Sequence, residues 1–257
     1  MITSSCCFFA FKYLAYEKWL KPPDVSVTTP TWKYTKSDSN FNWVSGHRYQ
    51  AIARSFDNAG NPETSYSTSS FTYDRESPVS APDTITDAEY YSSLSIGGTA
   101  QDGPTGAGLF NAGLDRVEVK LVDVSTGACW TGSGWSWTLF DYVQADGTQA
   151  WTYNDISMSN FTTGHPYRLN TKACDNIGNE DISVTTTTFY VDKTPPDTTL
   201  VQPFHGAKCN SLIPPGQTVP PHQLNGNSYD KPDLDAGIYN SGIDTVKVKL
   251  YDVTKSS

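Results

Sequence analysis

The sequence predicts an all-β protein built from antiparallel β-sandwich repeats, one of them complete and two partial. Two observations support this. Apolar and polar residues alternate with a period of two in several segments, which is typical of strands with one buried face. Two long motifs also recur along the chain. Short strands separated by Gly, Asp and Asn turns, without a helical period, indicate a sandwich rather than a helical fold.

The two recurring motifs define the predicted domains. AGLFNAGLDRVEVKLVDVS at 107–125 matches AGIYNSGIDTVKVKLYDVT at 236–254 at 11 of 19 positions. The segments that begin with GHRY at 46 and GHPY at 164 match at 12 of 33 positions. Extra residues of the last copy lie in the proline-rich segment SLIPPGQTVPPHQ, which we expect to be a surface loop. The predicted domains are the C-terminal half of a unit over 1–78, a complete unit over 79–196, and the N-terminal half of a unit over 197–257.

The strands of the complete unit follow from its alternation. Residues 115–123 and 167–173 alternate most strictly, so each is predicted to bury one face. We expect Val119, Trp151, Tyr167 and Phe189 to lie in the core between two sheets. The other predicted strands are 93–100, 127–131, 134–140, 142–146, 149–154 and 182–191.

Two features allow more than one interpretation. Residues 6–20 fit either a divergent copy of the strands around Trp130 to Leu139 or a short helix ended by Pro22 and Pro23. The five cysteines show no CxxC spacing that would suggest structural zinc. Cys129 and Cys174 fit either a disulfide or two buried thiols.

Two segments resemble known extracellular modules. The run YRLNTKACDNIGN at 167–179 resembles the penultimate strand and following turn of fibronectin type III and immunoglobulin-like modules. FYVDKTPPDTTL at 189–200 is similar to the last strand and linker of bacterial Ig-like repeats found in large secreted or surface proteins. The resemblance implies an immunoglobulin-like sandwich, a location outside the cell or on its surface, and neighbouring Ig-like units as partners. It does not imply a ligand, because such modules have many functions.

Composition and motifs argue against several function classes. The net charge of −9 and the absence of a basic stripe disfavour nucleic-acid binding. No apolar run reaches the roughly 20 residues of a membrane span, and residues 6–20 lack the pattern of a signal peptide. The sequence contains no HExxH, GxSxG or phosphate-loop motif. A small sandwich also offers no deep pocket of its own, so we predict no enzyme activity and no catalytic residues.

The turn DN(A/I)GN, which occurs at 57–61 and 175–179, has a structural and a chemical interpretation. The structural one is an Asx turn, in which the Asp side chain accepts backbone amides and the Gly takes a positive φ. The chemical one is a calcium site, because Ca²⁺ binds several carboxylate, amide and carbonyl oxygens. In a fibronectin-like order, the loops that follow 101 and 174 lie at the same end, beside the incoming linker. The predicted calcium ligands are Asp74, Asp102, Asp115, Asp175 and Asn179.

Trp130, Trp135 and Trp137 flank the turn TGSG at 131–134. Trp130 and Trp135 are expected to face each other across a hairpin. These side chains either pack across the strands or form an exposed ledge that stacks on sugar rings.

Together these observations predict a non-catalytic extracellular Ig-like repeat region of a bacterial surface or secreted protein, serving as a stalk, spacer or adhesin-type module. Calcium is its only expected cofactor. The alternatives are a carbohydrate- or protein-binding module, with a surface glycan or protein as partner, and an accessory region of a secreted enzyme.

Overall fold

The computed structural model describes residues 8–13, 16–20, 25–28, 31–34, 43–139, 141–202, 205, 224–234 and 237–254. The chain forms two compact units. One contains Met1–Ser80, Ala100–Arg116 and Lys172–Ser183, and the other contains Ala81–Thr99, Val117–Thr171 and Val184–Ser257. These units follow spatial contacts and not the sequence repeat, so the domain boundaries after residues 78 and 196 stay a prediction. Cys6, Cys7, Cys209 and the proline-rich segment at 211–223 lie outside the described residues.

The N-terminal part of the chain forms strands. β1 (Phe8–Tyr13) pairs antiparallel with β2 (Tyr16–Leu20) and with β5 (His47–Arg54), and β5 pairs with β6 (Ser67–Tyr73). A separate hairpin joins β3 (Val25–Thr28) to β4 (Thr31–Tyr34). The helix considered for residues 6–20 is therefore wrong, because pairing of β1 with both β2 and β5 satisfies the backbone in an extended conformation.

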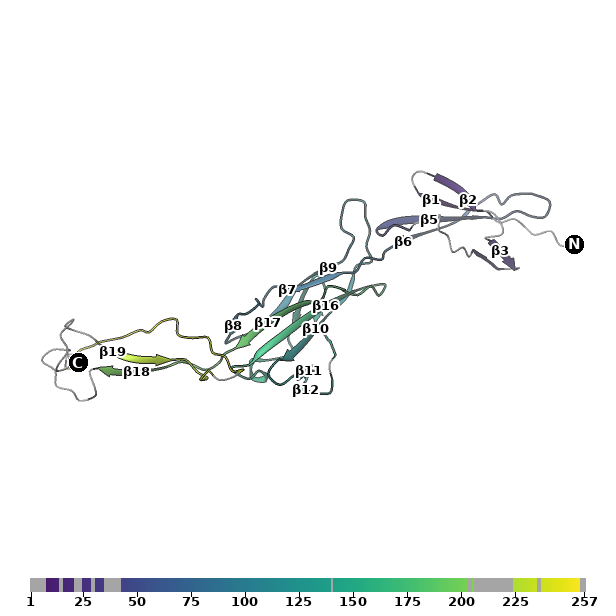
Figure 1. Ribbon diagram of the computed structural model, residues 1–257. Coiled ribbons are helices and arrows are strands. Elements are labelled where there is room, and N and C mark those ends of the chain that lie inside the picture. The colour runs from purple at the N-terminus through teal and green to yellow at the C-terminus, as the bar shows by residue number, and fades with distance from the viewer. Residues whose placement is uncertain are drawn as a thin grey trace. The chain divides into compact units, whose positions relative to one another are not determined.

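The larger sheet contains the two most strictly alternating segments of the sequence. They form β10 (Leu114–Asp123) and β16 (Pro166–Asp175), which are neighbours in the sheet (Figure 1). The predicted burial is confirmed, since Val119, Tyr167 and Phe189 are 0% exposed. The sheet order is β12 (Trp135–Ser136), β11 (Cys129–Trp130), β10, β16, β17 (Thr185–Val191), β8 (Tyr90–Tyr91), with β13 (Val143–Gln144) also paired to β10.

A second sheet has the order β14 (Asp146–Gly147), β15 (Ala150–Tyr153), β9 (Ile96–Gln101), β7 (Val79–Pro82). It also contributes to the core, because Trp151 on β15 is 1% exposed and the Trp130 indole N–H of β11 donates to the Tyr153 hydroxyl at 2.9 Å. In the described parts of the chain one 3₁₀ turn, η1 (Met158–Asn160), follows β15. The regular structure of the described residues is thus almost entirely β, and it has the Ig-like architecture predicted from the sequence. The strand pairs are antiparallel except for β17 and β8, which pair in parallel. In the described residues no helix is long and apolar enough to cross a membrane.

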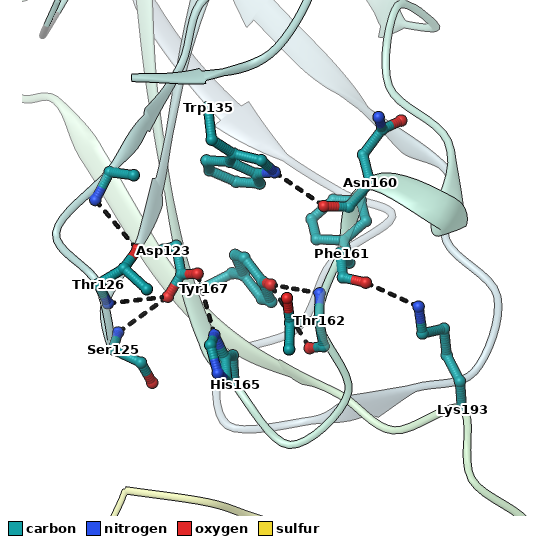
Figure 2. A network of polar contacts seen from close by, with 11 residues as sticks. Asp123, Ser125, Thr126, Trp135, Asn160, Phe161, Thr162, His165, Tyr167 and Lys193 are labelled. Atoms are coloured by element: carbon teal, nitrogen blue, oxygen red, sulfur yellow. Dashed lines mark hydrogen bonds and ion pairs between the residues drawn. The ribbon is translucent and has the colours of Figure 1, made fainter. Parts of the chain in front are cut away.

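A buried tyrosine fixes the start of β16. The Tyr167 hydroxyl accepts the Thr162 backbone N–H at 2.7 Å, and its ring packs on Phe161 at a centroid distance of 4.8 Å (Figure 2). The earlier repeat is built the same way, because the Tyr49 hydroxyl accepts the Val44 N–H at 2.8 Å. Burial raises the pKa of Tyr167, so the phenol stays protonated at neutral pH.

Replacing Tyr167 with phenylalanine should lower the free energy of unfolding by about 1 kcal/mol, because the Thr162 N–H loses its acceptor while the ring packing is kept. Urea denaturation followed by far-UV circular dichroism measures the change. The matched variant Tyr49→Phe should cost a similar amount in its own repeat. An unchanged midpoint for both variants would contradict the assigned role of the hydroxyl.

The last described part of the chain contains a two-stranded sheet. β18 (Asp197–Gln202) pairs with β19 (Asn225–Tyr229), as β7 neighbours β9 in the complete unit. Residues 244–252 match residues 115–123 of β10 at six of nine positions but form no strand. Their apolar side chains are exposed, with Val248 at 63% against 0% for the equivalent Val119.

Candidate metal centre

Three carboxylates meet inside the first compact unit. Asp74 follows β6, Asp102 follows β9, and Asp175 ends β16. Oxygens from the three side chains lie within 4.8 Å of one another, and the residues are only 7%, 5% and 2% exposed, respectively. The segments that carry them are far apart in the sequence, so only the fold brings these charges together.

Asp74 is held by groups from three segments. Its Oδ1 accepts the Ser45 hydroxyl at 3.1 Å and the Glu76 N–H at 3.0 Å, and its Oδ2 accepts the Ala112 N–H at 2.7 Å. Asn111 stabilises the loop that carries Ala112, because its side-chain amide donates to the Asp102 carbonyl at 3.2 Å. Both oxygens of Asp74 are therefore fixed in position before any ligand binds.

Asp175 is the first residue of a DNIGN turn. Its Oδ1 accepts the N–H groups of Ile177 and Asn179 at 3.0 and 2.7 Å, while Gly178 has a φ of +92°. Asp57 makes the same turn, with Oδ1 accepting from Ala59 and Asn61 at 2.9 and 2.8 Å. The Asx-turn interpretation therefore describes both copies. The hydrogen bonds from Asn61 lower the pKa of the exposed Asp57.

Asp102 differs from the other two carboxylates, because one of its oxygens has no hydrogen-bond partner. Oδ2 accepts the Gly113 N–H at 2.7 Å, but the buried Oδ1 is unpaired among the described residues. Burial raises the pKa of Asp102, the Gly113 hydrogen bond opposes the rise, and the charges of Asp74 and Asp175 add to it. A divalent cation would satisfy this oxygen and neutralise most of the local charge, and carboxylate oxygens are the ligands that Ca²⁺ prefers.

The other predicted metal ligands have different roles. Asp115 forms an ion pair with Arg116 at 2.8 Å and is not among the three clustered residues. Asn179 turns its amide nitrogen toward the site, donating to Asp175 Oδ2 at 2.8 Å. Nearby Glu180 lies 3.4 Å from Lys172, and Asp181 accepts the Ser80 N–H at 2.9 Å. Of the five predicted residues, the structure thus brings together Asp74, Asp102 and Asp175.

A related arrangement recurs one repeat later, in the second compact unit. Asp192 Oδ2 accepts the Ser241 N–H at 2.8 Å and its Oδ1 accepts the Thr163 hydroxyl at 3.4 Å, as Asp74 does from Ala112 and Ser45. Here the Ser241 hydroxyl also donates to Asp230 Oδ2 at 3.2 Å. Ala112 has no hydroxyl to offer Asp102. Sequence reasoning placed Asp192 and Asp230 at this second junction but missed the Ser, Thr and Asn side chains that hold the two arrangements. A Ser or Thr before both GH motifs and an Asn at both 111 and 240 were available signals.

The three tryptophans of the predicted ledge lie in different environments. Trp130 and Trp135 pair directly across β11 and β12, as predicted, but Trp130 is 2% exposed. The Trp135 indole donates to the Asn160 carbonyl at 2.8 Å, and its ring lies 5.5 Å from that of Tyr167 (Figure 2). Trp137 is 65% exposed. Cross-strand packing therefore explains the first two, and only Trp137 has the exposure that a ledge needs.

Cys129 and Cys174 are both free and buried, which agrees with the thiol alternative and not with a disulfide. Burial raises the pKa of the Cys174 thiol and keeps it protonated.

Comparisons with known proteins find structural likeness alone. No protein-family model and no curated protein matches the sequence. A tetra-tandem repeat in the extending region of a large adhesion protein is 13% identical with a TM-score of 0.33, covering 79% of this chain and 45% of that one. A 1.5-MDa bacterial ice-binding adhesin is 15% identical with a TM-score of 0.38, covering 78% and 57%. The FN1–FN3 domains of chicken CNTN1 are 13% identical with a TM-score of 0.29, covering 74% and 57%. This chain therefore spans about half the length of the structures it resembles.

Proposed function

We propose that this chain is a non-catalytic, extracellular repeat region of a bacterial surface or secreted protein. In this proposal it acts as a spacer in a stalk or adhesin, and calcium binds Asp74, Asp102 and Asp175. The observation that carries the proposal is the buried cluster of three carboxylates around the unpaired Asp102 oxygen. Without a cation, the repulsion and burial of these charges destabilise the folded state. A cation that binds them stabilises it.

The repeated construction of the linkers supports the spacer role. The residues at 74–76 and 192–194 follow the last strands of two successive sequence repeats, and the Asp that begins each makes the same kinds of hydrogen bond. Each Asp accepts the backbone N–H of the residue two positions later in the chain: Asp74 from Glu76 at 3.0 Å and Asp192 from Thr194 at 3.1 Å. Each also accepts from a Ser or Thr hydroxyl and from a backbone N–H of the following loop. A linker fixed in the same way at each repeat suits a protein that must project at a set length.

Calcium should fix the position of Asp74 relative to the loops that carry Asp102 and Asp175. We expect limited proteolysis of the full chain to cut the 74–78 segment more slowly in calcium than in chelator, since cleavage requires local opening. Magnesium should protect less, because Mg²⁺ demands a smaller octahedral site and keeps its waters. Equal cleavage in calcium and chelator would contradict the cation site.

A second experiment tests the extracellular location independently of the calcium site. Intact cells that produce the parent protein should bind an antibody raised against this chain, and protease added outside the cells should remove the signal. A signal that appears only after lysis would overturn the extracellular role, whatever the result with calcium.

A further inference from the structure

The larger sheet has a hollow on the face opposite its core. The odd-numbered residues at 117–121 of β10 and at 167–173 of β16, such as Val119 and Leu169, are fully buried. The hollow is instead lined from these strands by even-numbered residues, including Lys120 and Arg168. Its volume is about 430 Å³, which falls within the range of small-ligand sites, roughly 300–1,000 Å³. The whole hollow lies in the second compact unit, apart from the carboxylate cluster.

The hollow has an apolar floor. Val122 and Cys129 are direct cross-strand partners, and they are 8% and 1% exposed although they line the outer face of the sheet. Tyr142 forms part of the wall, next to β13. An apolar floor under an open polar rim suits a ligand that has both C–H and polar surface.

The rim of the hollow is basic, whereas the protein as a whole carries a net charge of −9. Lys120 Nζ lies 5.8 Å from the centre of the Tyr142 ring, which is within the range of a cation–π contact, and both residues line the hollow. Arg168 is exposed, and within the described parts of the chain no acidic side chain forms an ion pair with its guanidinium. Two cations over an apolar floor favour an anionic ligand.

Strands β16 and β17 bring side chains to the hollow that can form hydrogen bonds with the hydroxyl groups of a ligand. Asn170 and Thr186 face each other across β16 and β17, and the Asn170 side-chain amide donates to the Thr186 hydroxyl at 2.6 Å. This leaves the Asn170 carbonyl as an acceptor and the Thr186 hydroxyl as a donor. Both line the same hollow as Arg168.

We infer that the hollow binds a carboxylate-bearing sugar unit of an acidic glycan. The Arg168 guanidinium pairs with the sugar carboxylate in the two-point geometry that arginine favours, and Lys120 adds a second positive charge. Asn170 and Thr186 bond the ring hydroxyls, and the C–H face of the sugar covers Val122 and Cys129. The inference does not depend on the proposed calcium site.

The test is a titration of the full chain with trigalacturonate, followed by calorimetry and by NMR of backbone amides. Neutral galactotriose and sodium sulfate serve as comparison ligands. The buffer contains chelator, so that calcium cannot bridge the sugar carboxylate to the carboxylate cluster. We expect trigalacturonate to bind with amide shifts at 120–122, 142 and 168–170, and the two comparison ligands to bind at least fivefold more weakly.

Three variants assign the binding to named side chains. Arg168→Gln should weaken binding about fivefold or more, and Arg168→Lys, which keeps the charge but loses the two-point geometry, should have an intermediate effect. Lys120→Gln should also weaken binding. Lys249→Gln is its matched control, because Lys249 occupies the same position of the sequence repeat but lies outside the hollow, and it should leave binding unchanged.

Three results would each overturn the inference. The first is an absence of binding at millimolar trigalacturonate. The second is equal binding of galactotriose or sulfate, which would indicate a site for any sugar or any anion. The third is binding by Arg168→Gln as tight as that of the parent chain, provided that the circular dichroism spectrum of the variant is unchanged.

Discussion

Replacing Trp151 with alanine should lower the free energy of unfolding by about 3–5 kcal/mol, the largest effect expected of any single substitution in this chain. The indole is 1% exposed and lies directly opposite Gly98 across β15 and β9. A Cβ at Gly98 would collide with the Ala81 carbonyl and with the Trp151 ring, so β9 has a glycine where the ring needs space. Removing the ring leaves a cavity that this backbone has little room to close.

Two further variants separate packing from other effects of the substitution. Trp151→Phe should cost less than alanine, since the buried indole N–H has no hydrogen-bond partner among the described residues and only volume is lost. Trp137→Ala should change stability by no more than about 0.5 kcal/mol, because Trp137 is 65% exposed. Urea denaturation measures all three variants. Equal losses for Trp151→Ala and Trp137→Ala would contradict the assigned core.

The second large effect is expected at Asp102. At free calcium one hundred times the dissociation constant, binding to the folded state alone adds about 2.7 kcal/mol to stability. Asp102→Asn should abolish this gain, because the cluster loses one charge. In chelator the same variant should be more stable than the parent chain. Its amide can donate to a neighbouring carboxylate, and the unpaired buried charge is gone. Thermal unfolding with calcium and with chelator gives both values.

The chain supplies matched controls for this prediction. Asp57 makes the same Asx turn as Asp175 but is exposed and lies outside the cluster. Asp57→Asn should therefore leave the calcium gain intact, whereas Asp175→Asn should reduce it. Ala112→Ser introduces the hydroxyl that Ser241 offers Asp230, and it should raise stability in chelator. Parallel responses of Asp57→Asn and Asp175→Asn to calcium would mean that the turn, and not a cation site, accounts for the effect.

The sequence predicted much of the fold because strand alternation and turn chemistry are local properties. The strict period-two pattern identified β10 and β16 within a few residues, and the TGSG turn placed Trp130 opposite Trp135. Residues 6–20 were ambiguous between strand and helix, since their apolar residues lack a clear period and two prolines follow. Pairing of β1 with both β2 and β5, a tertiary interaction, decided in favour of strands.

The candidate site was predictable only in part. Three of the five proposed ligands converge, but Asp115 forms an ion pair with its neighbour Arg116, and Asn179 presents its nitrogen. The spacing of acidic residues in a loop does not determine the directions of their side chains. It therefore cannot predict which of them join the carboxylate cluster. The unpaired oxygen of Asp102 is likewise a property of the assembled loops, because it depends on what Ala112 and Gly113 can offer.

The sequence by itself determined which segments can form strands, which face of each strand is apolar, and that the same unit recurs. The tertiary structure decided which of those segments become strands. Residues 115–123 and 244–252 are identical at six of nine positions. Yet the first stretch lies in β10 with Val119 fully buried, while the second is not a strand and leaves Val248 63% exposed. Alternation supplies an apolar face, but a strand also needs neighbouring strands to bond its N–H and C=O groups and to cover that face.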